Sequence, residues 1–119
     1  PMKKFALVDA AMNDLLRPSL YSAYHEVLPV KQATADSSVS KMDIVGPICE
    51  SGDFIAKDRE MPEVKDDDLL FIRTCGAYAS SMASNYNSRP RAAEVYVSGG
   101  DYQVVRPRES MTSIWESER

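Results

Sequence analysis

Residues 46–53 constrain the fold of this chain more than any other feature. They place a thiol, a hydroxyl and two carboxylates within five positions, beginning with Cys49 and Glu50 and including a flexible glycine. Apolar residues stand on both sides of this polar group. The pattern predicts a strand over 42–48, a tight turn, and a second strand over 53–57. Loops held between strands often carry binding and catalytic groups.

The composition limits the classes of protein that the chain can represent. Its 119 residues suit one domain over 1–119, and 44% hydrophobic with 27% charged residues is ordinary for a globular fold. A net charge of -4 argues against nucleic-acid binding. No apolar run is long enough to predict a membrane span. A single histidine, His25, and two isolated cysteines argue against a metal site and fit a reducing cytoplasm.

Turn residues divide the rest of the chain into short elements. Pro18 suits the first turn of a short helix, which would place Arg17 and Tyr21 on one side of it. Gly99 and Gly100 predict a hairpin whose two central residues both have positive φ. Further strands are predicted over 5–8, 25–30, 69–72, 93–97 and 102–105, with helices over 77–85 and 109–117 and polar connections over 34–40 and 60–68. Residues 5–8 and 69–72 are expected to be buried, and the helix over 109–117 is expected to pack its apolar side. Many short strands with few helices predict a mainly β sandwich or barrel.

The stretch GPICESGDFIAKDREMP, residues 46–62, resembles the CESGD region of diaminopimelate decarboxylase, the pyridoxal-phosphate enzyme that makes lysine. Residues 9–21 end in RPSLY and resemble its RPxLY segment. GAY at 76–78, followed by SMASNYNSRP at 81–90, resembles a third block. The blocks occur in the family's order, and Ala79 departs from the family by replacing its second glycine in a turn.

The resemblance implies a larger protein. The family has an N-terminal (β/α)8 barrel with the lysine that binds the cofactor aldehyde, followed by a β domain of the alanine racemase and ornithine decarboxylase type. No lysine of this chain lies in a block that resembles the cofactor-lysine motif, and the chain starts at Pro1. We therefore expect the C-terminal β domain alone, inactive by itself and exposing the surface that meets the barrel. The resemblance also implies a cytoplasmic homodimer with shared active sites.

The same resemblance implies a reaction and residue roles. The reaction converts meso-2,6-diaminoheptanedioate to L-lysine and carbon dioxide with pyridoxal 5'-phosphate. Cys49 resembles the proton donor, because a neutral thiol can reprotonate carbon. Glu50 resembles the glutamate that binds the distal ammonium, and Arg17 and Tyr21 the pair that binds the distal carboxylate. Tyr78 resembles the tyrosine that touches both substrate and cofactor. Cys49 and Glu50 would act across the dimer.

Each of these residues also has a purely structural interpretation. Cys49 can be a small buried hydrophobic residue, Glu50 a solvated turn residue and Arg17 half of a surface ion pair. Tyr21 can be a packed core ring, and Tyr78 an aromatic residue of a hairpin. Ser51 and Asp53 are expected to support the loop, and Cys75 is expected to be buried. Residues 66–68, Asp66, Asp67 and Asp68, predict a solvated turn. The remaining polar and aromatic candidates are expected to be structural residues near the domain contact (Asn85, Asn87 and Arg89) and core or contact residues (Tyr86, Tyr96 and Trp115).

Two other functions remain open at this point. One is a related decarboxylase of the same fold that acts on ornithine, arginine or carboxynorspermidine. The other is a non-catalytic β domain that serves dimerisation or binding. The combination of CESGD with the RPSLY segment at residues 17–21 favours diaminopimelate decarboxylase over both.

Overall fold

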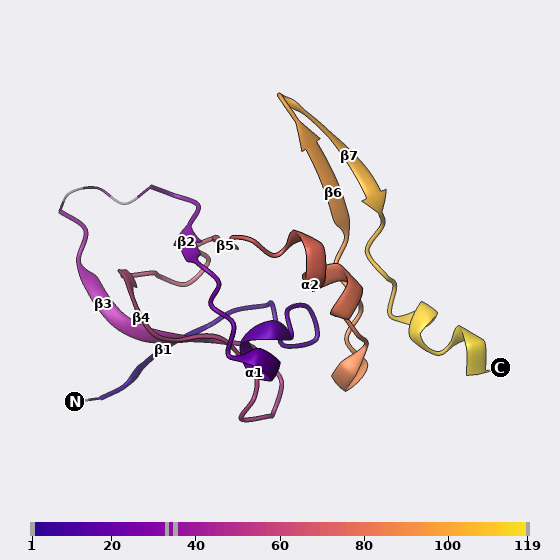
Figure 1. The fold of residues 1–119 in the computed structure, drawn as a ribbon, viewed down its shortest axis with the longest axis horizontal. Helices are drawn as coiled ribbons and strands as arrows, with labels where there is room; N and C mark the ends of the chain where they lie inside the picture. Colours follow the sequence, from indigo (N-terminus) through magenta and orange to yellow (C-terminus); the bar gives the residue numbers. More distant parts are fainter. Residues whose placement is uncertain (1, 33, 35, 119) are drawn as a thin grey trace.

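The computed structural model describes residues 2–32, 34 and 36–118, which form three small open sheets with short helices beside them (Figure 1). The first sheet has the order β1-β3-β4, the second pairs β2 with β5, and the third pairs β6 with β7. The strands are β1 (Lys4–Leu7), β2 (Val27–Pro29), β3 (Val39–Val45), β4 (Phe54–Pro62), β5 (Leu70–Ile72), β6 (Glu94–Ser98) and β7 (Asp101–Arg106). The helices are α1 (Arg17–Tyr21), α2 (Gly76–Met82) and the 3₁₀ turns η1 (Tyr86–Ser88), η2 (Thr112–Ile114) and η3 (Glu116–Glu118).

The first sheet joins distant parts of the chain. β1 runs parallel to β3, with Ala6 opposite Ile44, and β3 is antiparallel to β4. The pairing of β3 with β4 shifts register around Ile44, which marks a bulge. At that bulge the backbone N–H of Asp58, with φ of 51°, donates to the Asp43 carboxylate at 2.7 Å. The strands on either side of the 46–53 loop are thus tied together along their length.

A single apolar cluster lies against this sheet. Ile44 and Ile55 are fully buried at its centre, and Leu15, two residues before α1, packs with them. The other buried members are Val27, Met42, Ala56 and Met61. Burying each of the larger side chains, all except that of Ala56, contributes about 1.5–3 kcal/mol relative to exposure. The core therefore sits beneath the strands that carry the 46–53 loop, so the loop projects from strands anchored in the buried core.

The mainly β prediction is confirmed, but the sheets are open and do not close into a barrel. The strand predicted over 53–57 continues to Pro62, because its pairing with β3 extends to Val39. The strand predicted over 25–30 is reduced to Val27–Pro29. The strands predicted over 5–8 and 69–72 are not buried on both faces as expected, because Phe5 and Phe71 are exposed. The loop predicted over 34–40 includes residue 35, which lies outside the described residues, and Val39 already belongs to β3.

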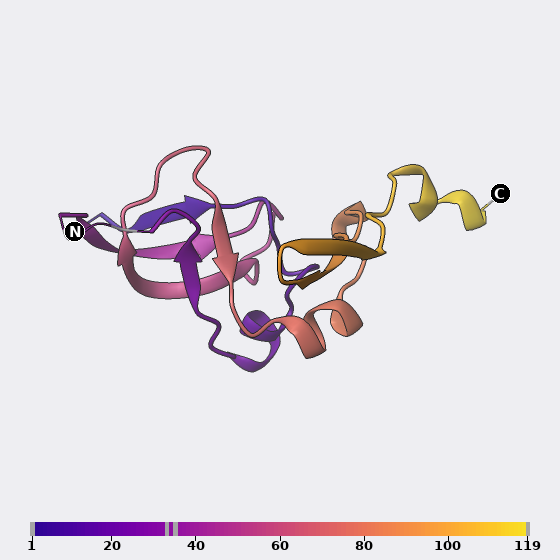
Figure 2. The same ribbon diagram turned by 90° about the horizontal axis from the view of Figure 1, so that it is seen from above.

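The C-terminal third extends away from the first sheet. The β6–β7 hairpin projects outward in Figure 1. In Figure 2 it lies between the first sheet and the yellow turns η2 and η3, which lie at the end of the molecule opposite β1. The hairpin prediction is confirmed, but of the two glycines only Gly99 has a positive φ, at 61°. The predicted closing helix is wrong: this segment forms two 3₁₀ turns, and Met111 and Trp115 remain exposed.

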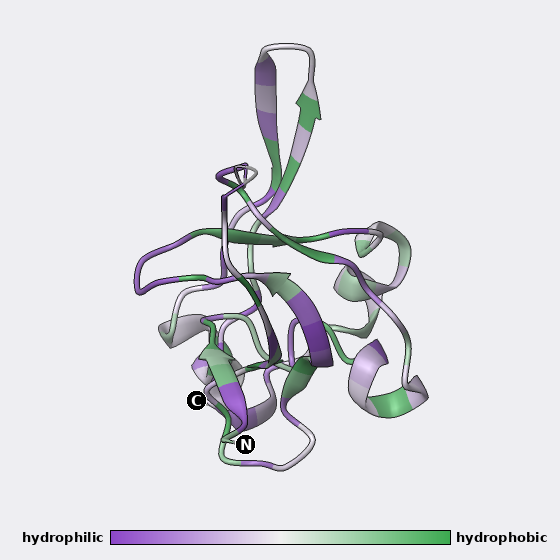
Figure 3. Cartoon of the chain, turned by 90° about the vertical axis from the view of Figure 1, so that its left-hand side faces the viewer, coloured by the Kyte–Doolittle hydropathy of each residue, from purple (hydrophilic) through white to green (hydrophobic). Residues whose placement is uncertain are grey.

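The exposed surface is large for a chain of this mass. It measures 8724 Å², whereas a compact 13.2 kDa monomer exposes about 6,400 Å². The radius of gyration is 15.8 Å, against about 13.5 Å for a compact domain of this length. In Figure 3 several strands carry apolar segments, drawn in green, and apolar side chains on them, such as Val97 and Val104, are exposed. Among the described residues, no helix has the length and apolar character needed to cross a bilayer.

Candidate functional site

The buried carboxylate of Asp53 organises the 46–53 loop. One of its oxygens accepts a hydrogen bond from the backbone N–H of Ile48 at 2.7 Å, which closes the turn from within. The other accepts from the backbone N–H of Met12, also at 2.7 Å, which ties the loop to the segment before α1. The Gly46 N–H donates to the Asp53 carbonyl at 3.1 Å. The prediction that Asp53 supports this loop is therefore confirmed.

Helix α1 presents Arg17 and lies beside the loop. Pro18 occupies the first turn, where a missing N–H costs no hydrogen bond, and Ser22 ends the helix in the left-handed conformation. A Cβ placed on Gly52 would come within 3.0 Å of the Ser19 hydroxyl, so the loop and the helix are in close approach. The predicted helix is confirmed, and it holds Arg17 and Tyr21 within one turn.

Arg17 and Tyr78 are brought together from different helices. The guanidinium carbon of Arg17 lies 5.2 Å from the centre of the Tyr78 ring, a cation–π contact. Arg17 is half-buried, and Tyr78, the third residue of α2, is exposed. A guanidinium over an aromatic ring keeps N–H donors that can bind a carboxylate. The interpretation of Tyr78 as a hairpin aromatic is wrong, since it belongs to a helix.

Glu50 stands at the turn of the loop and has a tyrosine partner. The Tyr86 hydroxyl donates to its carboxylate at 2.5 Å, and this hydrogen bond raises the pKa of the Tyr86 phenol above its ordinary value. Cys49, the preceding residue, is exposed, so the interpretation of Cys49 as a buried hydrophobic residue is wrong. Tyr21 is also exposed and is therefore not a packed core ring. The loop thus presents a thiol and a carboxylate side by side.

Buried Asn13 joins two of the sequence blocks. Its side-chain amide donates to the carbonyl of Ser84 at 3.2 Å, and its side-chain oxygen accepts from Arg89 at 2.9 Å. Arg89 also donates to the carbonyl of Asp9 at 2.5 Å. These contacts give Arg89 the structural role predicted for it. Sequence reasoning assigned no such role to Asn13, and the available signal was a polar residue four positions before Arg17, inside the block that ends in RPSLY.

A second polar network holds the segment after η1. Glu109 accepts hydrogen bonds from the Arg91 side chain at 2.6 Å and from the Asn85 amide at 2.6 Å. The pKa of the Glu109 carboxyl is lowered to about 2, mainly because its charged form accepts hydrogen bonds from Arg91. Asn85 also donates to the carbonyl of Arg89 at 3.0 Å, which confirms a structural role. Tyr86 therefore sits between two anchored residues, Ser84 and Arg89.

Buried His25 and half-buried Cys75 lie close together, apart from the candidate site. The Nδ1 atom of His25 lies 3.1 Å from the carbonyl oxygen of Arg73 and 3.8 Å from the Cys75 sulfur. Burial raises the pKa of the Cys75 thiol, although the residue is only half-buried and not fully buried as predicted. The described residues hold no group of three or more histidine, cysteine or acidic side chains suited to a metal ion.

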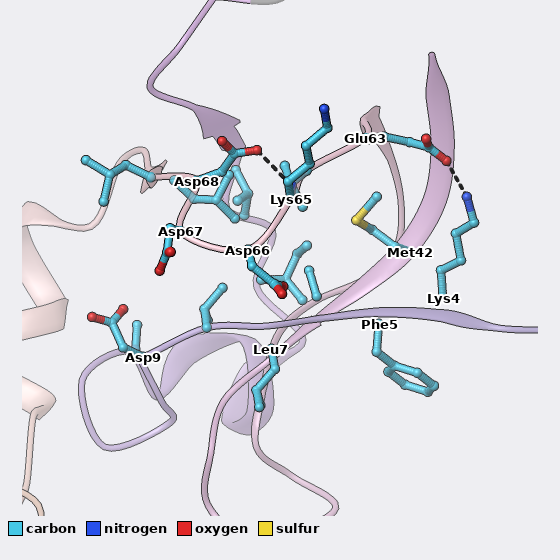
Figure 4. A pocket seen from close by; sticks show the side chains of 18 of the residues that line it. Lys4, Phe5, Leu7, Asp9, Met42, Glu63, Lys65, Asp66, Asp67 and Asp68 are labelled. Carbon is cyan, nitrogen blue, oxygen red and sulfur yellow. Dashed lines mark hydrogen bonds and ion pairs between the residues drawn. The ribbon is translucent and has the colours of Figure 1, made fainter. Parts of the chain in front are cut away.

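A cleft of about 920 Å³ lies between β1 and the segment 63–70 (Figure 4). Lys4 and Glu63 form an ion pair at its rim, and the backbone N–H of Lys65 donates to Asp68 at 2.7 Å. Asp66, Asp67 and Asp68 are exposed, which confirms the predicted solvated turn. None of the candidate residues from the loop, α1 or α2 lines this cleft. The candidate site is therefore the surface formed by the 46–53 loop, α1 and α2.

The chain matches a known family. Residues 1–76 match the family described as pyridoxal-dependent decarboxylase, C-terminal sheet domain, and the chain belongs to it. Its similar relatives within that family are diaminopimelate decarboxylases. That of Neisseria meningitidis serogroup B is 55% identical over 109 residues, which cover 92% of this chain and 26% of the relative.

Solved structures agree with this assignment. A crystal structure of a protein from Aquifex aeolicus superposes with a TM-score of 0.92 at 50% identity, covering 98% of this chain and 28% of that protein. Diaminopimelate decarboxylase from Helicobacter pylori, complexed with L-lysine, gives a TM-score of 0.89 at 45% identity, covering 98% of this chain and 28% of the enzyme. This chain thus spans about a quarter of the length of its relatives.

Proposed function

We propose that this chain is the C-terminal domain of a diaminopimelate decarboxylase that converts meso-2,6-diaminoheptanedioate to L-lysine and carbon dioxide. The observation that carries the proposal is the pairing of Arg17 with Tyr78 on the surface beside the loop of Cys49 and Glu50. Relatives that are diaminopimelate decarboxylases match nearly the whole chain at about half identity. The chain contributes the residues that recognise the substrate.

Recognition is argued from the two ends of the substrate. The reacting end must lie at the cofactor, and the distal end carries a carboxylate and an ammonium group. Arg17 offers a planar fork that matches the two oxygens of a carboxylate, and Tyr21 adds a phenol donor from the same helix. Glu50 from the loop of a second subunit would offer a carboxylate to the ammonium group. The residues of the two subunits together complement both charges of the distal end.

Cys49 is proposed as the group that returns a proton to carbon after carbon dioxide leaves. Its exposed thiol stands beside Glu50 on a loop whose backbone is held by Asp53. Pyridoxal 5'-phosphate, when bound, accepts the electrons released at the reacting carbon. Tyr78 is the residue of this chain proposed to contact the cofactor. Its side chain is exposed, and its phenol would donate a hydrogen bond to a phosphate oxygen. The lysine that binds the cofactor aldehyde is proposed to lie in the remaining part of the protein.

The large exposed surface supports docking to that remaining part. The excess over a compact monomer exceeds 2,000 Å², which is within the range that interfaces between tightly associated units bury. Phe5, Tyr96 and Val97 are among the exposed apolar side chains. We assign this surface to contacts with an N-terminal barrel domain and with a second subunit, and Cys49 and Glu50 to the active site of that second subunit. The whole enzyme is proposed to be cytoplasmic.

The test is an assay of the full-length protein. Purified protein with its cofactor should release carbon dioxide from meso-2,6-diaminoheptanedioate, and at least a hundredfold more slowly from ornithine or arginine. Residues 1–119 alone should neither retain a cofactor absorbance band after dialysis nor release carbon dioxide. Faster turnover of ornithine or arginine would assign the chain to a related decarboxylase. Absence of turnover on all three would favour a binding domain.

A further inference from the structure

Tyr86 contacts Glu50 from a segment that is distant in the sequence. Its hydroxyl donates to the Oε2 atom of Glu50 at 2.5 Å, and both side chains are exposed. An exposed glutamate in a turn samples several rotamers, and fixing such a side chain costs free energy whenever a ligand binds. A tyrosine that already holds the carboxylate removes part of that cost.

The backbone around Tyr86 is anchored on both sides. The Ser84 N–H donates to the carbonyl of Asn13 at 3.0 Å, and the Tyr86 N–H donates to the Ser84 hydroxyl at 3.3 Å. On the other side, Arg89 is bonded to the buried Asn13 side chain at 2.9 Å. The segment thus has little freedom, so the phenol is a fixed point against which the Glu50 side chain is oriented.

The Glu50 backbone is ordered as well. Its N–H donates to the carbonyl of Ile48 at 2.7 Å, and its carbonyl accepts from the Asp53 N–H at 3.0 Å. Tyr86 occupies Oε2, which leaves Oε1 as the oxygen available to a ligand. A Cβ built on Gly52 would lie 3.3 Å from Oε1, so the absence of a side chain at Gly52 keeps the approach to this oxygen open.

We propose that Tyr86 is a positioning residue for recognition of the distal ammonium group: it holds one oxygen of Glu50 so that the other accepts from the ammonium. This inference rests on the proposed function. It adds a residue that binds no substrate itself and acts through Glu50. Because Tyr86 and Glu50 belong to the same chain, the pair moves as a unit into whichever active site the loop completes.

The test uses the full-length enzyme with Tyr86→Phe, which removes one oxygen and keeps the ring. The KM for meso-2,6-diaminoheptanedioate should rise about tenfold, equivalent to about 1.4 kcal/mol, while kcat changes less than about twofold. The inhibition constant of 2-aminoheptanedioate, which lacks the distal ammonium, should stay within about twofold. Tyr24→Phe, whose exposed ring lies against the Arg59 guanidinium of the same chain, is the matched control and should change neither constant.

A double-mutant cycle separates positioning from general loss of structure. In a Glu50→Gln background, Tyr86→Phe should raise KM by less than about twofold, because the carboxylate through which it acts is already gone. Equal weakening of both ligands, or a full additional effect in the Glu50→Gln background, would overturn the inference.

A crystal structure of the full-length wild type and of Tyr86→Phe gives a readout that does not depend on turnover. The wild type should show the phenol bonded to Glu50, and the variant should show the carboxylate turned away or spread over several rotamers. A wild-type enzyme that retains the contact but does not turn over the diamino substrate would refute the proposed function. An active wild type without the contact would refute the role of Tyr86 alone.

Discussion

The Arg17 guanidinium lies 5.2 Å from the centre of the Tyr78 ring, so a residue of α1 and a residue of α2 share one surface. Neither helix is long enough to be stable alone, and each is held by the segments that flank it. The contact therefore depends on the anchoring of α1 to the 46–53 loop and of the segment after α2 to Asn13.

Replacing Arg17 with lysine should weaken substrate binding more than cofactor binding. Lysine keeps the charge but loses the planar fork and its stacking on Tyr78. We expect KM of the full-length enzyme to rise by the equivalent of about 1.5–3 kcal/mol, with cofactor occupancy unchanged. KM and cofactor absorbance should be measured together. Arg73→Lys, which alters an exposed ion pair with Glu26, is the control, and an unchanged KM for Arg17→Lys would place Arg17 outside the site.

Replacing Cys49 with alanine should slow turnover of the full-length enzyme by about 10²–10⁴-fold, because the proposed proton donor is lost. Substrate binding should be retained. Mixing this variant with one that lacks the cofactor-binding lysine should restore activity, since a mixed dimer regains one intact site. Subunit exchange is checked by mass, and exchange without recovered activity would contradict the shared site.

Gly46→Ala should destabilise the protein through Asp53. The added Cβ would lie 2.4 Å from a carboxylate oxygen of Asp53, which is buried and cannot move without breaking its bonds to Met12 and Ile48. We expect a loss of about 2–4 kcal/mol in the free energy of unfolding. Gly100→Ala is the matched control, because an added Cβ there meets nothing within 4 Å. Equal stability of the two variants in urea unfolding would contradict the role of Asp53.

The Glu109 network predicts a pH dependence of stability. Its hydrogen bonds to Arg91 lower the Glu109 pKa in the folded protein to about 2, from an ordinary value of 4.5. A lowered folded-state pKa stabilises the protein above the unfolded value, and this contribution is lost as the pH falls from about 4.5 toward 2. The difference in unfolding free energy between wild type and Glu109→Gln should therefore be larger at pH 6 than at pH 3. A difference that does not change with pH would show that the charge of Glu109 is not involved.

Local patterns predicted the elements whose causes are local. Pro18 starts α1, the two glycines at 99 and 100 form the hairpin turn, and the polar loop over 46–53 joins two strands, as expected. The predictions failed where pairing between strands decides the outcome. β4 runs to Pro62 because β3 continues beside it, and the last segment stays in 3₁₀ turns with its apolar side chains exposed.

The sequence by itself determined the family, the order of the main elements and the residues that resemble a substrate site, since these depend on residue types at short spacing. Only the tertiary structure decided which of these residues meet. It stacks Arg17 on Tyr78, joins Tyr86 to Glu50 and leaves Cys49 exposed. The physical reason is that these contacts join segments far apart in the sequence. Buried polar groups such as Asp53 hold those segments in place. No short-range pattern specifies the partner of a buried hydrogen-bonding group.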